Sequence, residues 1–402
     1  ADAITLATIA TAAVVDLAAG TDSLTFGNFT NSATVSNAET VTGGTGADTI
    51  TLGTTLTGVT MDLAAGTDSL TLANVVNTGT LSNVENVTGG TAIDTITLAT
   101  ALAGTVNLGT GIDVLNLGNF ANTGTVSNVE TLTGNADVDT ITIGAALVAA
   151  TINLAGGTDV LTLGNFSNTA TVSNAETLTG GTGADLVTLG TTLTGMTLNL
   201  GAGTDSLTLA NVANTGTVSG AETITGGTAA DDVTLATIAT AAVVDLGTGT
   251  DALTFGNFTN SATVSNVETI TGGTGADTIT LGAAITAGTI DLAAGTDSLT
   301  FGAFANSATV SNAETITGGS AVDTITLGTA LSGTTVNLGA GADVLNLGNF
   351  ANTGTVLNVE TLNGNADVDT ITLTAIMTAG VVNLAGGTDV LTFGNFINSA
   401  TV

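Results

Sequence analysis

The chain has 402 residues, no Lys, Arg, His, Cys, Pro, Trp or Tyr, and 33 acidic residues that give a formal charge of −33. A chain without cationic side chains cannot neutralise nucleic-acid phosphates and is repelled by anionic membrane surfaces, so we expect neither nucleic-acid binding nor direct membrane insertion. Hydrophobic residues make up 43 % of the chain and charged residues only 8 %, a composition that predicts a folded core rather than disorder.

Short alternating segments are the predicted elements. DTITLG at 48–53 places Ile50 and Leu52 on one face, and TMDLAAG at 60–66, DSLTL at 68–72 and GTLSNVENVTGG at 79–90 are further candidate strands. Gly, Asn and Asp mark the corners between them. Two-residue hairpin turns of the Asn-Gly type are not a feature of the repeat, since Asn-Gly occurs once in the chain, whereas similar strands at long fixed spacing stack in parallel. The sequence therefore predicts an all-β fold, a parallel β-solenoid of the β-helix or β-roll kind.

The chain is a tandem array with a period of about 46 residues, and such periods are typical of solenoids, propellers or arrays. We treat it as one solenoid, and the sequence leaves open whether a unit makes one coil or two. A longer period of about 229 residues is superimposed, because ATIATAAVVDL recurs at 7 and 236, which indicates duplication of a five-unit block. The units are 1–46, 47–92, 93–137, 138–183, 184–229, 230–275, 276–321, 322–367 and the incomplete 368–402.

Three acidic series follow this period and account for most of the charge. The first series is Asp48, Asp94, Asp139, Asp185, Asp231, Asp277, Asp323 and Asp369. The second lies about 20 residues further on and consists of Asp22, Asp68, Asp113, Asp159, Asp205, Asp251, Asp297, Asp343 and Asp389. The third is Glu39, Glu85, Glu130, Glu176, Glu222, Glu268, Glu314 and Glu360, in the phrase S-N-A/V-E-T.

A glycine-rich turn precedes the first series. The full pattern GGxGxD occurs three times, at Gly43, Gly44, Gly46 and Asp48, at Gly180, Gly181, Gly183 and Asp185, and at Gly272, Gly273, Gly275 and Asp277. These turns resemble the nonapeptide of the RTX, or haemolysin-type calcium-binding, repeat family, and the phrases around them are similar to those of bacterial β-strand-repeat surface proteins. The resemblance implies structural Ca²⁺. Other turns depart from the pattern, as in GGTAID before Asp94 and GNADVD before Asp139.

The residues themselves allow two interpretations of these turns. Glycine with positive φ can present carbonyl oxygens, Asp adds charge, and Ca²⁺ binds six to eight such oxygens. Stacked aspartates repel one another, and no Lys or Arg compensates them. The candidate calcium ligands are therefore the nine glycines of the full motifs and the aspartates of the first two series from Asp48 to Asp389. In the other interpretation the turns are corners of a metal-free solenoid, in which Asp caps backbone amides through Asx-turns.

Two further files of side chains are expected if equivalent residues stack. Asn28, Asn74, Asn119, Asn165, Asn211, Asn257, Asn349 and Asn395 would form an Asn ladder or be corner residues with positive φ. Thr49 with Thr51, Thr95 with Thr97, and their equivalents would form a T-x-T file similar to those of ice-binding solenoids. The simpler interpretation, that Thr is a good outward strand residue, is favoured because Leu186 and Asp232 interrupt the file.

The functional expectation is structural. Without His, Cys or Lys the common nucleophile and base pairs are missing, and the carboxylates are equivalent copies, so no enzyme activity is expected. We expect a secreted, extracellular or cell-surface bacterial protein, a calcium-stabilised solenoid that builds a surface layer, filament or matrix by associating with itself. The alternative is the rod, spacer or ligand-binding region of a long calcium-dependent adhesin, including an ice-binding one.

Overall fold

The computed structural model describes all residues 1–402 and contains strands and turns but no helix. The chain divides into two compact units, one formed by Ala1–Thr191 and Met196–Asp205 and the other by Thr192–Gly195 and Ser206–Val402. Strands β1 to β22 lie in the first unit and β23 to β44 in the second. Each unit is a parallel β-solenoid, as the sequence predicts.

Two sheets make up the first unit. The odd-numbered strands are β1 (Ala3–Leu6), β3 (Ser23–Phe26), β5 (Thr40–Thr42), β7 (Thr57–Asp62), β9 (Asn77–Ser82), β11 (Asp94–Leu98), β13 (Val114–Asn116), β15 (Thr131–Asn135), β17 (Ala150–Ala155), β19 (Thr169–Ser173) and β21 (Leu186–Leu189). The even-numbered strands are β2 (Ala13–Asp16), β4 (Ser32–Ser36), β6 (Thr49–Leu52), β8 (Ser69–Thr71), β10 (Asn86–Gly90), β12 (Thr105–Gly109), β14 (Thr123–Ser127), β16 (Thr140–Ile143), β18 (Val160–Thr162), β20 (Thr177–Gly181) and β22 (Thr197–Gly201).

The second unit has the same organisation. Its odd-numbered strands are β23 (Ser206–Thr208), β25 (Thr223–Gly227), β27 (Ala242–Gly247), β29 (Ser261–Ser265), β31 (Thr278–Leu281), β33 (Ser298–Thr300), β35 (Thr315–Thr317), β37 (Ser332–Asn337), β39 (Thr353–Leu357), β41 (Thr370–Leu373) and β43 (Val390–Phe393). Its even-numbered strands are β24 (Asn214–Ser219), β26 (Asp231–Leu235), β28 (Ala252–Thr254), β30 (Thr269–Thr271), β32 (Gly288–Asp291), β34 (Ser307–Ser311), β36 (Thr324–Leu327), β38 (Val344–Asn346), β40 (Thr361–Asn365), β42 (Thr378–Ala385) and β44 (Ser399–Thr401).

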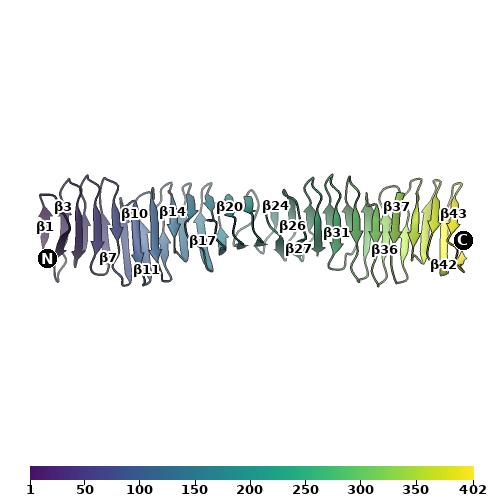
Figure 1. The fold of residues 1–402 in the computed structure, drawn as a ribbon, viewed down its shortest axis with the longest axis horizontal. Helices are drawn as coiled ribbons and strands as arrows, with labels where there is room; N and C mark the ends of the chain where they lie inside the picture. Colours follow the sequence, from purple (N-terminus) through teal and green to yellow (C-terminus); the bar gives the residue numbers. More distant parts are fainter. The chain divides into compact units, whose positions relative to one another are not determined.

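Within each unit every strand pairs in parallel with the strand two further along the chain, so one odd and one even strand make one coil. β1, β3 and β7 follow one another along the stack of the first unit (Figure 1). The apolar residue of each alternating segment points inward, as in the in-register file of Leu24, Val41 and Met61, all with 0 % exposure. The core is therefore a stack of aliphatic side chains between the two sheets.

The 46-residue repeat contains an odd number of strands, which the sequence did not reveal. Residues 47–92 hold five strands, β6 to β10, because segment 79–90 is divided into β9 and β10 by Asn83, whose φ is 51°. With two strands per coil, one repeat makes two and a half coils, so the alternatives of one or two coils are both wrong. Equivalent strands of successive repeats consequently lie in opposite sheets.

Because equivalent strands alternate between the sheets, neither the T-x-T pairs nor the asparagine series can stack as a continuous file. Thr49 and Thr51 are in β6 of the even sheet whereas Thr95 and Thr97 are in β11 of the odd sheet, so the T-x-T pairs do not stack on one another. The expected Asn ladder is wrong for the same reason, because Asn28 follows odd β3 and the next member follows even β8; none of these asparagines has positive φ. Threonines from different phrases stack instead, as do Thr40, Thr60, Thr80 and Thr97 in the odd sheet.

Candidate functional site: the buried carboxylate ladders

The acidic residues lie at the corners that precede the strands and turn their side chains inward. In the corner before the even strands of the first unit, Asn31, Asp48, Asp68 and Glu85 occupy four successive coils. Asn31, Asp48 and Asp68 are buried, with at most 1 % exposure, and Glu85 is half-buried. The structure thus brings the three acidic series together into one column, which we call a carboxylate ladder.

We call each side chain of a ladder a rung. Each rung accepts a hydrogen bond from a backbone N–H of the coil before it. The N–H of Asn31 donates to Oδ1 of Asp48 (2.8 Å), that of Asp48 to Oδ1 of Asp68 (2.6 Å), and that of Asp68 to Oε2 of Glu85 (2.7 Å). The corner amides have no strand partner at these points, and the carboxylates satisfy them. The carboxylates therefore hold successive coils together at their corners.

The first rung of this ladder is Asn31, which the sequence did not identify as a site residue. The side-chain oxygen of Asn31 accepts the N–H of Ala10, and its amide group donates to the carbonyls of Gly27 and Phe29 and to Oδ1 of Asp48. The signal was present in the phrase F-x-N-S/T, three residues after the asparagine series that we expected to stack. The same ladder is complete in five other places: Asn77, Asp94, Asp113 and Glu130; Asn122, Asp139, Asp159 and Glu176; Asn214, Asp231, Asp251 and Glu268; Asn260, Asp277, Asp297 and Glu314; and Asn306, Asp323, Asp343 and Glu360.

The remaining candidate aspartates belong to shorter runs of the same contacts. The N–H of Asp185 donates to Oδ1 of Asp205 (2.8 Å), and that of Asp369 to Oδ1 of Asp389 (2.9 Å). At the start of the chain Asp22 accepts the N–H of Asp2 and donates its own N–H to Glu39. Every candidate aspartate therefore accepts a backbone amide.

The motif glycines make room for this arrangement. A Cβ on Gly43 would lie 2.3 Å from the carbonyl oxygen of Leu63 and 2.8 Å from Oδ2 of Asp48, and one on Gly46 would lie 2.4 Å from the carbonyl carbon of Phe29. Before the second series, a Cβ on Gly295 would lie 2.6 Å from Oδ1 of Asp297. Glycine and aspartate therefore occur together because the inward-turned carboxylate and the adjacent coil occupy the space of a side chain.

The expectation that the motif glycines adopt positive φ is wrong. None of the nine glycines of the three full motifs has a left-handed backbone; their close approach to the neighbouring coil demands glycine instead. Left-handed residues lie elsewhere, for example Asn37 (57°) and Ala64 (68°) just after strands.

The ladders concentrate negative charge where water is excluded. Burial, which outweighs the hydrogen bond from the preceding coil, raises the pKa of Asp68, Asp113 and Asp159 to about 6, and the negative charges of the neighbouring rungs add to this rise. The pKa values of Asp251, Asp297 and Asp343 are raised by the same causes. A negative charge at the second aspartate of each of these ladders is therefore costly.

Buried carboxylate oxygens that lack a hydrogen-bond donor indicate whether the ladders are suited to bind a cation. Oδ2 is buried without a hydrogen-bond partner in Asp22, Asp68, Asp94, Asp113, Asp139, Asp159, Asp185, Asp231, Asp251, Asp297, Asp343 and Asp369. A buried anionic oxygen without a donor is a suitable contact for Ca²⁺, which prefers carboxylate and carbonyl oxygens. In Asp48 and Asp277, by contrast, Oδ2 accepts the N–H of Gly44 and Gly273 (both 3.2 Å). No three carboxylates of the chain converge as one metal site, so backbone carbonyls would complete the coordination.

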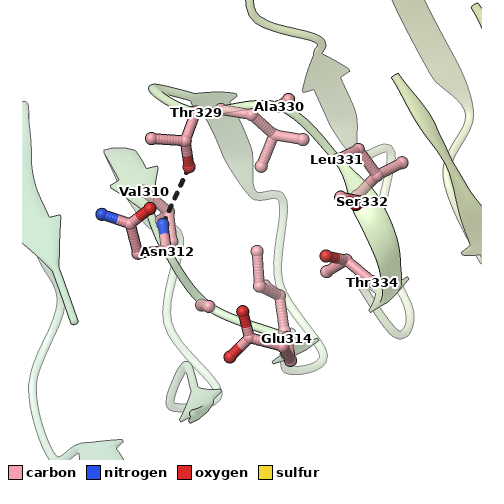
Figure 2. A pocket seen from close by; sticks show the side chains of 11 residues that line it. Val310, Asn312, Glu314, Thr329, Ala330, Leu331, Ser332 and Thr334 are labelled. Carbon is pink, nitrogen blue, oxygen red and sulfur yellow. Dashed lines mark hydrogen bonds between the residues drawn. The ribbon is translucent and has the colours of Figure 1, made fainter. Parts of the chain in front are cut away.

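The glutamate end of a ladder borders a cavity in the second unit. Glu314 lies beside a cavity of about 180 Å³ that Thr329, Leu331 and Thr334 also line. Figure 2 shows the Glu314 carboxylate at this cavity and the N–H of Asn312 donating to Oγ1 of Thr329 (2.8 Å) on its far side. The half-buried Glu314 is therefore the most exposed rung of this ladder.

A comparison among repeats shows where the chain requires a carboxylate. At an outer corner position the side-chain oxygen accepts the N–H two residues later in every repeat, and this residue is Asp16, Asp62, Asn107, Asn153, Asn199, Asp245, Asp291, Asn337 or Asn383. Asn and Asp are thus interchangeable where one acceptor oxygen suffices. At the two aspartate rungs of the ladders the chain has Asp in every repeat and never Asn. A role as hydrogen-bond acceptor alone does not account for that difference.

Comparison with known proteins brings no match to a protein-family model, to a curated protein or to a solved structure. No helix of the structure is long and apolar enough to cross a membrane.

Proposed function

We propose that this chain is a non-catalytic structural protein, a calcium-stabilised β-solenoid that forms part of a secreted surface layer, extracellular filament or matrix. The observation that carries the proposal is the strict use of Asp at buried rungs, although Asn would supply the same acceptor oxygen without a buried charge. At most of these rungs Oδ2 has no hydrogen-bond donor. A carboxylate retained against this cost indicates that its charge is used.

Calcium is the cation that best suits these residues. Apart from the thioethers of three Met, the side chains offer only oxygen ligands, because the chain lacks His and Cys, and hard oxygen ligands favour Ca²⁺ over transition metals. Aspartate oxygens and corner carbonyls of the chain would hold the ion, and the bound ion would supply the positive charge that no side chain provides.

The test is to count bound metal. The full chain is dialysed to equilibrium against millimolar calcium in physiological salt, and the metal on both sides of the membrane is measured by inductively coupled plasma mass spectrometry, with magnesium as the comparison. We expect several calcium ions per chain and few magnesium ions, because Mg²⁺ demands a stricter octahedral geometry. A chain with no calcium in excess of the surrounding buffer would contradict the proposal.

A second candidate is the ligand-binding rod of an adhesin, which the in-register threonines favour. Thr105, Thr125, Thr142, Thr162 and Thr179 occupy one outward file of the even sheet, and most of the outward residues around them are Thr, Ser or Asn. Regular uncharged hydroxyl rows suit a neutral ordered partner, including ice. Thermal hysteresis in a freezing assay tests this candidate, and its absence removes the ice-binding form.

A further inference from the structure

A single threonine of the chain is buried. Thr334 is 6 % exposed, and every other buried polar side chain is an Asn or an Asp. Thr334 lies four residues before the leucine of the phrase N-L or D-L, and in every other repeat this position holds Ala, Gly, Val or Met, for example Val59 and Gly380. The hydroxyl group of Thr334 makes no hydrogen bond within the chain. A buried polar group that is both exceptional and unsatisfied calls for an explanation.

The nearest polar neighbour of Thr334 in the stack is the glutamate at the end of a ladder. The N–H of Thr335 donates to the carbonyl of Glu314 (3.0 Å), and Thr335 pairs with Thr315. Glu314 and Thr334 each precede a member of this pair, so they lie at the same register on neighbouring coils, about 4.8 Å apart along the stack. Both line the cavity of about 180 Å³ described above (Figure 2).

One oxygen of the Glu314 carboxylate is free at this cavity. Oε2 accepts the N–H of Asp297 (2.7 Å), whereas no hydrogen bond of the chain reaches Oε1. The carboxylate is half-buried, and the chain has no Lys, Arg or His that could pair with it. An anionic oxygen and a hydroxyl group therefore face one cavity, and neither has a partner in the chain.

The inner wall of the cavity is aliphatic. Val310, Ala313, Ile316, Leu327 and Leu331 line it, and all five are buried. An engineered apolar cavity of about 150 Å³ in another protein binds benzene. A cavity of about 180 Å³ with this lining therefore has room for an organic body of about that size.

The equivalent place in the following repeat is almost filled. Val359 and Met377 occupy the positions of Ala313 and Leu331 there, and the space that they line is only about 10 Å³. The strand position of Thr334 is glycine in that repeat. The larger wall residues and the missing hydroxyl group thus occur together, as expected if cavity and hydroxyl group belong to one site.

We propose that this cavity binds a small primary ammonium ion with an apolar body about the size of a benzene ring. The ammonium group would donate hydrogen bonds to Oε1 of Glu314 and to Oγ1 of Thr334, and the apolar body would contact the aliphatic wall. A chain with a net charge of −33 attracts a cation and repels an anion of the same size. This site goes beyond the proposed structural function and does not depend on calcium at the aspartate rungs.

The test titrates the full chain with benzylammonium in physiological salt and follows binding by saturation-transfer difference spectroscopy. Benzyl alcohol and benzoate are the neutral and anionic probes of the same size. We expect benzylammonium to bind about tenfold more tightly than benzyl alcohol, because a hydrogen bond to a charged group contributes more than a neutral one, and benzoate not to bind. A chain that does not bind benzylammonium, or that binds the alcohol equally well, would overturn the proposal.

Two substitutions separate this cavity from general attraction to an acidic chain. Glu314→Gln keeps an acceptor for the N–H of Asp297 and removes the charge, so it should weaken benzylammonium binding about tenfold. Glu360→Gln is the matched control, since Glu360 holds the N–H of Asp343 in the same way but ends the ladder of the following repeat (2.9 Å). Equal weakening by the two changes would mean that the ammonium ion does not depend on this cavity, which refutes the proposal.

A third variant covers the case in which Glu314→Gln fails to fold. Ala313→Val combined with Leu331→Met introduces the pair that the chain itself carries in the following repeat, and it leaves Glu314 and Thr334 unchanged. This variant should lose benzylammonium binding because the cavity is filled, while its melting temperature stays close to that of the wild type. Undiminished binding by the filled variant would show that the ion lies elsewhere.

Discussion

The backbone N–H of Asp277 donates to Oδ1 of Asp297, 2.7 Å away and one coil further along the solenoid. Both aspartates are buried, and Oδ2 of Asp297 has no hydrogen-bond partner. One oxygen of this carboxyl group therefore fastens the corner, while the other is available to a cation or a proton. The following predictions separate these two uses.

Replacing Asp297 separates the acceptor from the charge. Asp297→Ala removes the acceptor and leaves the N–H of Asp277 buried and unsatisfied, which should cost about 1–3 kcal/mol of unfolding free energy with or without calcium. Asp297→Asn keeps an acceptor and removes a buried charge. In chelator this variant should therefore be at least as stable as the wild type, whereas in calcium it should be less stable than the wild type in calcium. Thermal melts under both conditions measure the difference.

The matched control for this pair is Asp245→Asn. Asp245 occupies the outer corner position at which other repeats have Asn, so this change should leave both melts unchanged. If Asp297→Asn also matched the wild type in calcium, the charge of the ladder would have no role in cation binding.

Acid should stabilise the metal-free protein. The pKa values of Asp68, Asp113 and Asp159 are raised to about 6 in the folded state, whereas an unfolded Asp has a pKa of about 3.9. Between these values the folded chain binds more protons than the unfolded chain, so stability falls as pH rises from about 4 to about 6 and levels off above that. The melting temperature in chelator should therefore be higher at pH 4 than at pH 7, and the opposite order would contradict the burial of these carboxyl groups.

The motif glycine should be required for packing. Gly43→Ala places a methyl group against the carbonyl of Leu63 and should cost about 1–3 kcal/mol, in chelator as in calcium. Gly156→Ala is the matched control, because its Cβ would meet nothing closer than 3.9 Å and other repeats have Ala at this position. Urea unfolding of both variants checks the prediction. A loss for Gly43→Ala confined to calcium would indicate that the glycine serves a metal site instead.

The buried asparagine should matter more than its exposed neighbour. Asn260 accepts the N–H of Ala239 and donates to Gly256, Phe258 and Asp277, so Asn260→Ala should lower the unfolding free energy by about 2–3 kcal/mol. Asn257→Ala changes an exposed side chain and should be nearly neutral. Equal losses in chemical denaturation would show that the ladder does not begin at Asn260.

The sequence predicted the architecture because the inward residues alternate with a period of two, and Ile50 and Leu70 lie inward as expected. It did not predict the two and a half coils per repeat, since this number depends on a chain reversal at Asn83 that only its left-handed backbone reveals. The hydrogen bonds of the ladders also depend on the number of coils per repeat, because two and a half coils per repeat place Asp48 and Asp68 one coil apart. The candidate aspartates accept backbone amides, but these amides belong to the neighbouring coil, 17 to 20 residues away in the sequence, and not to the Asx-turns that the alternative interpretation assumed. Calcium binding remains a prediction.

The most direct test of the proposed function is a thermal melt of the full chain by circular dichroism, first in excess chelator and then in millimolar calcium. If calcium neutralises the buried ladders, the β signal and the melting temperature should both rise substantially with calcium and not with an equal ionic strength of sodium chloride. An unchanged, high melting temperature in chelator would show that the backbone amides suffice to hold the carboxylates, and that the solenoid is metal-free.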